Sequence, residues 1–265
     1  MKRIRTVVII ATLIWTSAAY ATVWYVHPDS VMNCIQDCLD SCSTGDTVLV
    51  GPGLYSENII WPSTHGIDLI SEYGVDMTYI DGGGTARVIE ITTGVDSTTT
   101  ISGFTIQNGY TAGIGCTQNT SPTITGNTIT GNTSSDHGGG IYCVLNSSPT
   151  ITENVITGNT GTWAGGIECN EYSSPIISGN TITGNTSYRG GGISCYYNSS
   201  PTITDNTITQ NTAAWTGGGI WCTVNSSPTI TGNIITDNTV TAGGEDVGGG
   251  ICCVLGSSPT ITDNT

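Results

Sequence analysis

The chain has 265 residues, only 9% of them charged, and twenty acidic residues outnumber five basic ones. Three basic residues lie within the first five positions, so beyond residue 21 two arginines face twenty carboxylates, a formal charge of −18. Such a chain cannot gather phosphates by releasing counterions, which excludes a nucleic-acid partner, and a polyanionic glycan would need a bridging cation.

The first 21 residues have the pattern of a signal peptide. Basic residues at positions 2, 3 and 5 precede an apolar run over 6–15, and Ala19–Ala21 forms an A-x-A cleavage site. The run is too short to cross a bilayer, and no later segment reaches the roughly 18 apolar residues that a spanning helix needs. We therefore expect a secreted or cell-surface protein without a transmembrane segment after cleavage.

Residues 22–120 are expected to form a cap and irregular first coils of a repeat structure. Ser30 can N-cap a short helix that would cover the open end of the first coil. The apolar face of this helix comprises Val31, Cys34, Ile35, Cys38, Leu39 and Cys42. Strand-like runs follow at Thr47–Val50, Asn58–Trp61, Asp68–Ser71, Arg87–Ile91 and Thr99–Ile106.

Residues 121–265 repeat a unit of about 26 residues, S-S-P-T-I-T-x-N-T-I-T-x-N-T, then a loop, then G-G-G-I-x-C. The clearest copy, Ser199 to Cys222, holds three period-2 segments: Pro201–Thr204, Thr207–Thr209 and Gly219–Cys222. Segments this short are stable only when stacked copies pair with one another. The repeat predicts an all-β, parallel β-helix solenoid with a short N-terminal capping helix.

Three columns of identical residues support the stacking. The expected inward row is Ile124, Ile151, Ile177, Ile203, Ile230 and Ile261. A corner column of asparagines can bond to its neighbours above and below: Asn127, Asn154, Asn180, Asn206, Asn233 and Asn264. The third column is Cys116, Cys143, Cys169, Cys195, Cys222 and Cys253.

The ten cysteines allow two interpretations. Export favours disulfides, and the Cα atoms of stacked cysteines fall within bridging distance. However, parallel Cβ vectors disfavour the dihedral angle that a disulfide needs about its S–S bond. Packing as free thiols is therefore the alternative. The same two options apply to Cys34, Cys38 and Cys42. Cys252 should point outward and be the most exposed thiol. The sequence contains no CxxC pair and no His–Cys cluster, so it does not indicate a zinc site.

The stretch "CIQDCLDSCSTGDTVLVGPGLYSENI", followed by "IDGGGTARVIEI" and "ISGFTIQNG", resembles the opening coils of pectin-lyase-like right-handed parallel β-helix proteins. The later units resemble the β-helix repeats of bacterial and archaeal secreted proteins. The resemblance covers essentially the whole mature chain. It implies a right-handed solenoid, but the superfamily includes lyases, hydrolases, adhesins and passive stalks, so function must come from the site.

The variable loop of each unit is the expected binding face, because insertions in solenoids collect on one side. Stacking should align the loops into an aromatic band that suits a polysaccharide or cell-surface glycan. Outward residues of the adjoining strand should extend it. The expected ligand-binding residues are Tyr142, Trp163, Tyr188, Arg189, Trp215, Trp221, Glu245 and Asp246.

Catalysis has only three candidate residues: Arg189, His137 and Glu168. Glycosidases need two carboxylates roughly 5–9.5 Å apart. Glu168 and Glu245 or Asp246 should be about three coils apart, roughly 14 Å at the usual strand spacing. The resemblance to lyases would imply a calcium cluster, so Ca²⁺ is the one cofactor left open, but no acidic cluster surrounds Arg189.

Three functions remain open on the sequence: a polysaccharide-binding protein, a pectin-lyase-like lyase or hydrolase, and a passive stalk or adhesin. Outward Thr-x-Thr pairs also resemble ice-binding ladders, although threonine is a favoured residue on any solvated strand. Thr265 lies within a sixth unit. We expect a continuation of the chain or a partner to cover the open end of the solenoid.

Overall fold

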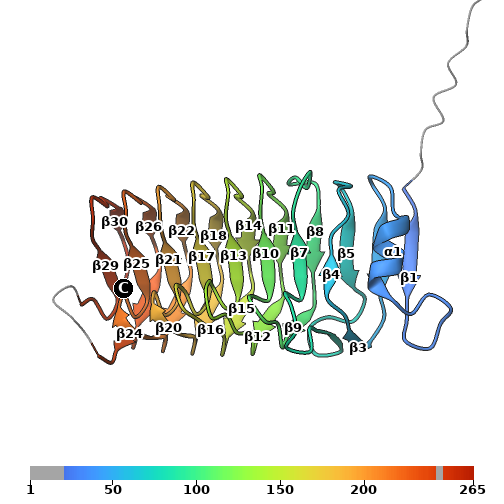
Figure 1. The fold of residues 1–265 in the computed structure, drawn as a ribbon, viewed down its shortest axis with the longest axis horizontal. Coiled ribbons are helices and arrows are strands. Elements are labelled where there is room, and N and C mark those ends of the chain that lie inside the picture. Colours follow the sequence, from blue (N-terminus) through green and yellow to red (C-terminus); the bar gives the residue numbers. More distant parts are fainter. Residues whose placement is uncertain (1–20, 243–246) are drawn as a thin grey trace, which may run out of the picture.

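The computed structural model describes residues 21–242 and 247–265. These residues form a right-handed parallel β-solenoid with one short helix at its N-terminal end (Figure 1). The predicted fold class is therefore confirmed. The predicted signal peptide, apart from Ala21, and the loop residues Glu245 and Asp246 lie outside the described residues.

Four parallel sheets run along the solenoid in the described part of the chain. Sheet A contains β1 (Val23–Val26), β2 (Thr47–Val50), β5 (Asp68–Ser71), β8 (Thr100–Ser102), β11 (Thr123–Thr125), β14 (Thr150–Thr152), β18 (Ile176–Ser178), β22 (Thr202–Thr204), β26 (Thr229–Thr231) and β30 (Thr260–Thr262). Sheet B contains β3 (Gly53–Ser56), β6 (Thr78–Asp81), β9 (Thr105–Gln107), β12 (Thr128–Thr130), β15 (Val155–Thr157), β19 (Thr181–Thr183), β23 (Thr207–Thr209) and β27 (Ile234–Thr236). Sheet C contains β4 (Ile59–Ile60), β7 (Ile89–Ile91), β10 (Ile114–Cys116), β13 (Ile141–Cys143), β17 (Ile167–Cys169), β21 (Ile193–Cys195), β25 (Ile220–Cys222) and β29 (Ile251–Cys253). Sheet D is built from the loops: β16 (Thr160–Gly161), β20 (Thr186–Arg189), β24 (Thr212–Thr216) and β28 (Thr239–Val240).

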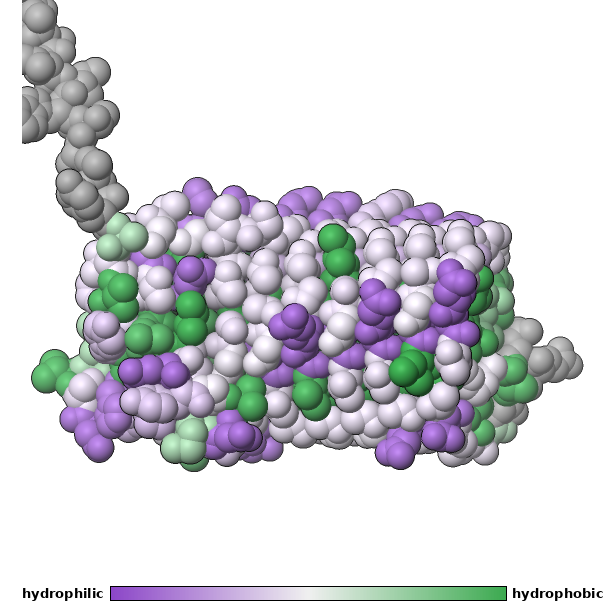
Figure 2. Space-filling model, turned by 180° about the vertical axis from the view of Figure 1, so that it is seen from behind, coloured by the Kyte–Doolittle hydropathy of each residue, from purple (hydrophilic) through white to green (hydrophobic). Residues whose placement is uncertain are grey.

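Copies of the repeat stack in register, as predicted. Ile151 pairs with Ile177, which pairs with Ile203, and the flanking threonines pair with the equivalent outward positions. The isoleucines of the predicted inward row fill the core, and within that row only Ile261, in the last described coil, is largely exposed. Seen from behind, the surface over the coils is mostly of intermediate hydropathy, with hydrophobic residues scattered across it (Figure 2). Because the strand residues of the coils fill the core or repeat from coil to coil, we look for a functional site on the loops, which differ between coils.

The corner asparagines form the predicted ladder. The Oδ1 of Asn180 accepts hydrogen bonds from the backbone N–H and Nδ2 of Asn154, at 2.9 and 3.1 Å, and Nδ2 of Asn180 donates to Oδ1 of Asn206 at 3.0 Å. A second ladder at the next corner repeats this pattern at Asn132, Asn159, Asn185, Asn211 and Asn238. Each buried amide therefore joins one coil to the next.

All ten cysteines are free thiols, and five of the inward column are fully buried. Burial raises the pKa of the Cys169 thiol, which keeps it protonated and unreactive at neutral pH. The prediction that Cys252 is the most exposed thiol is wrong. Cys252 is buried because the backbone of Gly248 lies against it, whereas Cys34, Cys42 and Cys253 are partly exposed.

Helix α1 (Ile35–Ser41) covers the first coil and packs against β1, β2 and β4, as predicted, but Ser30 does not cap it. The Ser30 hydroxyl bonds to the carbonyls of His27 and Met32, and Val31 is fully exposed. The N-cap residue is Cys34, and the free N–H groups of Ile35 and Gln36 donate instead to the Glu57 carboxylate, at 2.9 and 3.0 Å. The Glu57 side chain, from the following coil, thus caps the N-terminus of the helix.

Replacing Glu57 by alanine should lower the free energy of unfolding by about 1–2 kcal/mol, because two helix N–H groups and the helix dipole lose their anionic partner. Urea unfolding followed by circular dichroism measures this change. Asp40→Ala is the control, since Asp40 is an exposed residue of the same helix whose carboxylate accepts a hydrogen bond from the Gln36 side chain and contacts no helix N–H group among those that Glu57 caps. Equal stabilities of the two variants would contradict the capping role.

Three of the predicted strand-like runs differ in extent, and the run Arg87–Ile91 is a strand only from Ile89 to Ile91. The run Thr99–Ile106 is two strands, β8 and β9, separated by a corner at Gly103, whose φ is +84°. The run Asn58–Trp61 pairs only at Ile59 and Ile60. Within the described residues no helix is both long and apolar enough to cross a membrane.

Candidate functional site

The loops lie directly on the outer face of sheet C. Its outward residues Tyr142, Glu168, Ser194 and Trp221 form one column, in register from strand to strand. A Cβ on Gly138 would come within 2.8 Å of Glu168 Cβ, and one on Gly217 within 2.7 Å of Trp221 Cβ. The glycine run of each repeat therefore lets loop backbone rest on the strand beneath.

This close approach corrects one prediction. Tyr142, Glu168 and Trp221 do point away from the core, as expected from alternation, but the loops bury them. Glu168 has no exposed surface at all. Of the three, Trp221 alone lines the pocket described below.

Aromatic rings from three coils stack on this face. The Trp163 ring lies parallel to Tyr196 and Trp221, with centroids 5.5 and 5.9 Å away. The loop residues Tyr188 and Trp215 stack on each other at 6.0 Å. Stacking places side chains that are 58 residues apart in sequence, Trp163 and Trp221, on one surface.

Arg189 lies among these rings. Its Cζ is 5.1 Å from the ring centroid of Trp163 and 5.3 Å from those of Trp221 and Tyr188. Among the described residues it has no carboxylate partner, whereas the other arginine of the solenoid, Arg87, pairs with Glu90. The guanidinium holds the indoles in place through cation–π contacts and keeps its N–H donors available.

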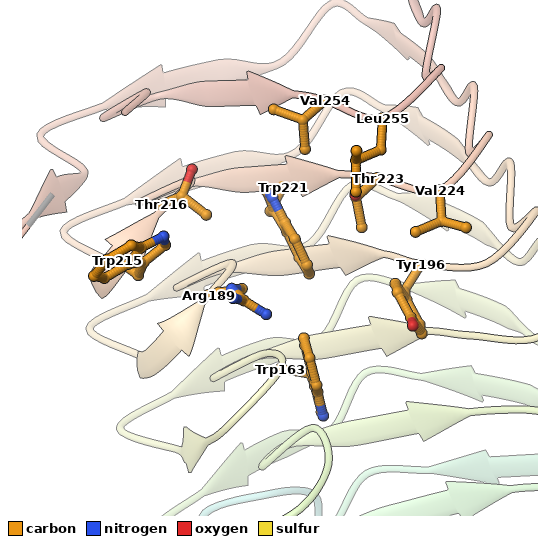
Figure 3. Close-up of a pocket in the computed structure, with 10 residues that line it drawn as sticks. All are labelled: Trp163, Arg189, Tyr196, Trp215, Thr216, Trp221, Thr223, Val224, Val254 and Leu255. Atoms are coloured by element: carbon orange, nitrogen blue, oxygen red, sulfur yellow. The ribbon is translucent and has the colours of Figure 1, made fainter. Parts of the chain in front are cut away.

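These side chains surround an open pocket of about 330 Å³ (Figure 3). Trp215 and Thr216 stand on the loop side, and Tyr196, Val224 and Leu255 stand on the opposite side. The lining residues are Trp163, Arg189, Tyr196, Trp215, Thr216, Trp221, Thr223, Val224, Val254 and Leu255. The pocket is lined mainly by aromatic and aliphatic side chains, with Arg189, Thr216 and Thr223 as polar members, a mixture that small-molecule and sugar sites commonly have.

The structure thus brings together Trp163, Arg189, Trp215 and Trp221, with Tyr188 behind Trp215. Tyr142 lies apart from them. Sequence reasoning missed Tyr196, although it follows Cys195 and so occupies an outward position like Ser194 on the other side of that cysteine. It also missed the corner residues Val224 and Leu255.

A second cluster surrounds Tyr142. His137 stacks on its ring at 4.3 Å, and the Arg87 guanidinium lies 5.3 Å from the same ring. Burial lowers the pKa of His137, and the charge of Arg87 adds to the effect. Burial raises the pKa of Glu168 to about 8, against the opposing hydrogen bonds of the Gly138 N–H and the Asn170 amide. Glu168 is therefore mainly the neutral carboxylic acid at pH 7, and its Oε2 has no hydrogen-bond partner within the described part of the chain.

A family model describing the right-handed β-helix region matches residues 88–265. The chain belongs to the right-handed β-helix family. Comparison with curated proteins gives no match. Among solved structures the chain is similar to an alginate lyase from Paenibacillus sp. strain FPU-7, at 13% sequence identity and a TM-score of 0.48, over 92% of this chain and 95% of that one. Similarity at this level carries no argument about activity.

The three catalytic candidates of this β-helix protein do not form one site. His137 stacks on Tyr142, and Glu168 lies beside Tyr142 on the neighbouring strand β17. Arg189 belongs to the aromatic pocket, on the loop that precedes β21, two strands beyond β13 in sheet C. Among the described residues, the pocket lining contains no carboxylate. Within the described ranges no three His, Cys, Asp or Glu residues are grouped to hold a metal ion.

Proposed function

We propose that this right-handed β-helix protein is a secreted or cell-surface polysaccharide-binding protein and that the aromatic pocket binds the glycan without catalysis. Export rests on the signal pattern of residues 1–21. The observation that supports binding is the set of parallel rings of Trp163, Tyr196 and Trp221 along an open pocket. Flat ring faces pack on the C–H surfaces of sugars, while few polar groups set orientation.

Exposure of the loop aromatics favours a ligand over simple covering of the loops. Trp215 is 42% exposed and stacks only on Tyr188, which is itself 44% exposed. Leaving two large rings in water forgoes the free energy of burial, about 25 cal/mol per Å² of apolar surface. A bound sugar would recover part of that burial. The N–H donors of Arg189, which have no carboxylate partner within the described residues, would bond to sugar oxygens.

Glycan-microarray binding tests the proposal. We expect at least one polysaccharide to be retained, and Trp163→Ala and Trp215→Ala to weaken its binding about tenfold or more, as the loss of a stacked ring implies. Tyr73→Ala is the matched control, because Tyr73 is an exposed ring far from the pocket, on the early coils.

Three other outcomes would reject the proposal. Release of shorter fragments from the bound polysaccharide, abolished in Arg189→Ala or His137→Ala, would assign a lyase or hydrolase. Binding that is unchanged in both tryptophan variants would move the site elsewhere. If the protein bound no glycan on the array, a passive stalk would be favoured, or an ice-binding surface if the protein also showed thermal hysteresis.

A further inference from the structure

The corner between sheets C and A has an unusual backbone. Each of the six coils from Gln118 onward places two successive residues there in the left-handed region, with φ between 48° and 80°. The first of the two is never glycine, asparagine or aspartate in the described coils; it is Gln118, Leu145, Glu171, Tyr197, Val224 and Leu255. Side chains with a Cβ disfavour this conformation, and a β-branched residue such as Val224 does so most.

The other two corners of the coil do not behave this way. Their positive-φ positions are mostly glycine or aspartate, as at Gly179, Asp205 and Gly232, which adopt this conformation at little cost. The same fold can therefore turn without bulky residues. Apolar side chains kept in an unfavourable backbone conformation indicate a role at the surface.

The apolar side chains at the first of these positions, together with Tyr172 at the second position where Glu171 occupies the first, form an apolar ridge, which we define as Leu145, Tyr172, Tyr197, Val224 and Leu255. Leu145, Tyr172, Tyr197 and Leu255 are 43, 54, 42 and 71% exposed. Backbone hydrogen bonds join each turn to the next, from Asn146 to Glu171, Tyr172 to Tyr197, Asn198 to Val224 and Asn225 to Leu255. The ridge therefore runs parallel to the solenoid axis, with one step of about 4.8 Å per coil.

The ridge continues the aromatic pocket. Val224 and Leu255 line the pocket opposite Trp215 (Figure 3). The Tyr197 ring lies 6.2 Å from that of Tyr196. Tyr172 packs edge-on against Tyr197 at 5.7 Å. Leu145, two coils beyond Tyr197, is outside the pocket altogether. One surface thus extends from Leu255 to Leu145 over five coils.

Charge narrows what this surface can bind. Glu171 stands within the row of turns that carries the ridge, and the chain beyond residue 21 has two arginines against twenty carboxylates. A polyanion or a second copy of this chain would be repelled, whereas an uncharged polymer would not.

We infer that the ligand is an uncharged polysaccharide in extended form, lying along the solenoid axis from the aromatic pocket over the apolar ridge. This inference rests on the proposed glycan-binding function and adds its charge, direction and length. Successive coils would contact successive parts of the chain, so several weak contacts add up to useful affinity.

Native gels containing hydroxyethylcellulose, glucomannan, xylan or laminarin test the inference against gels containing alginate or polygalacturonate. We expect at least one neutral polymer, and neither polyanion, to retard the protein. Leu145→Asn and Tyr197→Asn should reduce the retardation about fivefold, because each removes an apolar contact of the polymer. Asparagine tolerates the left-handed conformation, so the melting temperature of both variants should stay the same or rise. Gln118→Asn, at the equivalent turn of the preceding coil, is the matched control and should leave retardation unchanged.

Chain length gives a second readout. In titration calorimetry the hexasaccharide of the retarding polymer should bind about tenfold or more tightly than its disaccharide. Equal affinities for the hexasaccharide and the disaccharide would overturn the extended site and leave the pocket proposal standing. The same conclusion would follow if Leu145→Asn and Tyr197→Asn were retarded as strongly as the wild type while Trp163→Ala was no longer retarded. Retardation by the polyanions alone would overturn the uncharged ligand. Retardation by none of the six polymers would overturn both proposals.

Discussion

Asn180→Ala is expected to lower the free energy of unfolding by about 4 kcal/mol, since several buried polar groups lose their partners at 1–3 kcal/mol each. The Asn180 side chain is buried in the ladder. Its Oδ1 accepts two hydrogen bonds from Asn154, and its Nδ2 donates to the carbonyl of Ile151 at 2.8 Å and to Oδ1 of Asn206. No water can replace these partners between two packed coils.

Asn264→Ala is the control for this change. Asn264 is the last described rung of the same ladder and is only partly buried, so water can reach the groups that it leaves. Its loss should cost clearly less than that of Asn180. Urea denaturation of both variants measures the difference. Equal, small losses would show that the ladder follows from the fold and contributes little to its stability.

Glu168→Gln should make the protein less sensitive to alkaline pH. The folded pKa of Glu168 is raised to about 8, whereas the carboxyl of an unfolded chain titrates near 4.5. Below 4.5 both states hold the proton and this group adds no penalty. Between 4.5 and 8 the unfolded state has lost the proton that the folded state keeps, so stability falls as pH rises, by about 1.4 kcal/mol per unit.

The expected loss from this one group is on the order of 5 kcal/mol by pH 8 and levels off above it. Glutamine has the same shape and does not titrate, so the variant should exceed the wild type in stability at pH 9 while the two differ little at pH 5. Chemical denaturation at both pH values measures this. Glu153→Gln, an exposed carboxylate at another corner, should retain the wild-type dependence. Parallel pH curves for the wild type and Glu168→Gln would refute a buried neutral acid.

The solenoid was predictable because its signal is repeated. Period-2 alternation around Ile151, Ile177 and Ile203 specifies the inward face of each strand, and equal spacing of the copies specifies which strands pair. A single unit would have been ambiguous. The asparagine column followed from the same logic, because identical amides at a corner can satisfy one another.

The loops were only partly predictable. Stacking predicted that Trp163, Tyr188, Arg189, Trp215 and Trp221 would come together, and they do. It did not predict that loop backbone would lie flat on sheet C and bury Tyr142 and Glu168. That outcome depends on glycines at which an added Cβ would come within 3 Å of the strand beneath, which spacing alone does not reveal.

The remaining errors concern contacts between unlike segments. The cap of α1 comes from Glu57, 22 residues after Ile35, and no local pattern marks a carboxylate that reaches back from the next coil. The apolar ridge was missed because the sequence of the turns does not disclose a left-handed backbone: Val224 and Leu255 occupy positions where glycine or asparagine would be expected.

A crystal structure of the protein with the hexasaccharide of its bound polysaccharide would decide where the glycan lies. We expect sugar rings over Trp163 and Trp215, with the chain continuing along the ridge toward Leu145. Sugar density on the threonine faces of sheets A and B, or an empty aromatic pocket beside an occupied site elsewhere, would contradict the proposed binding surface.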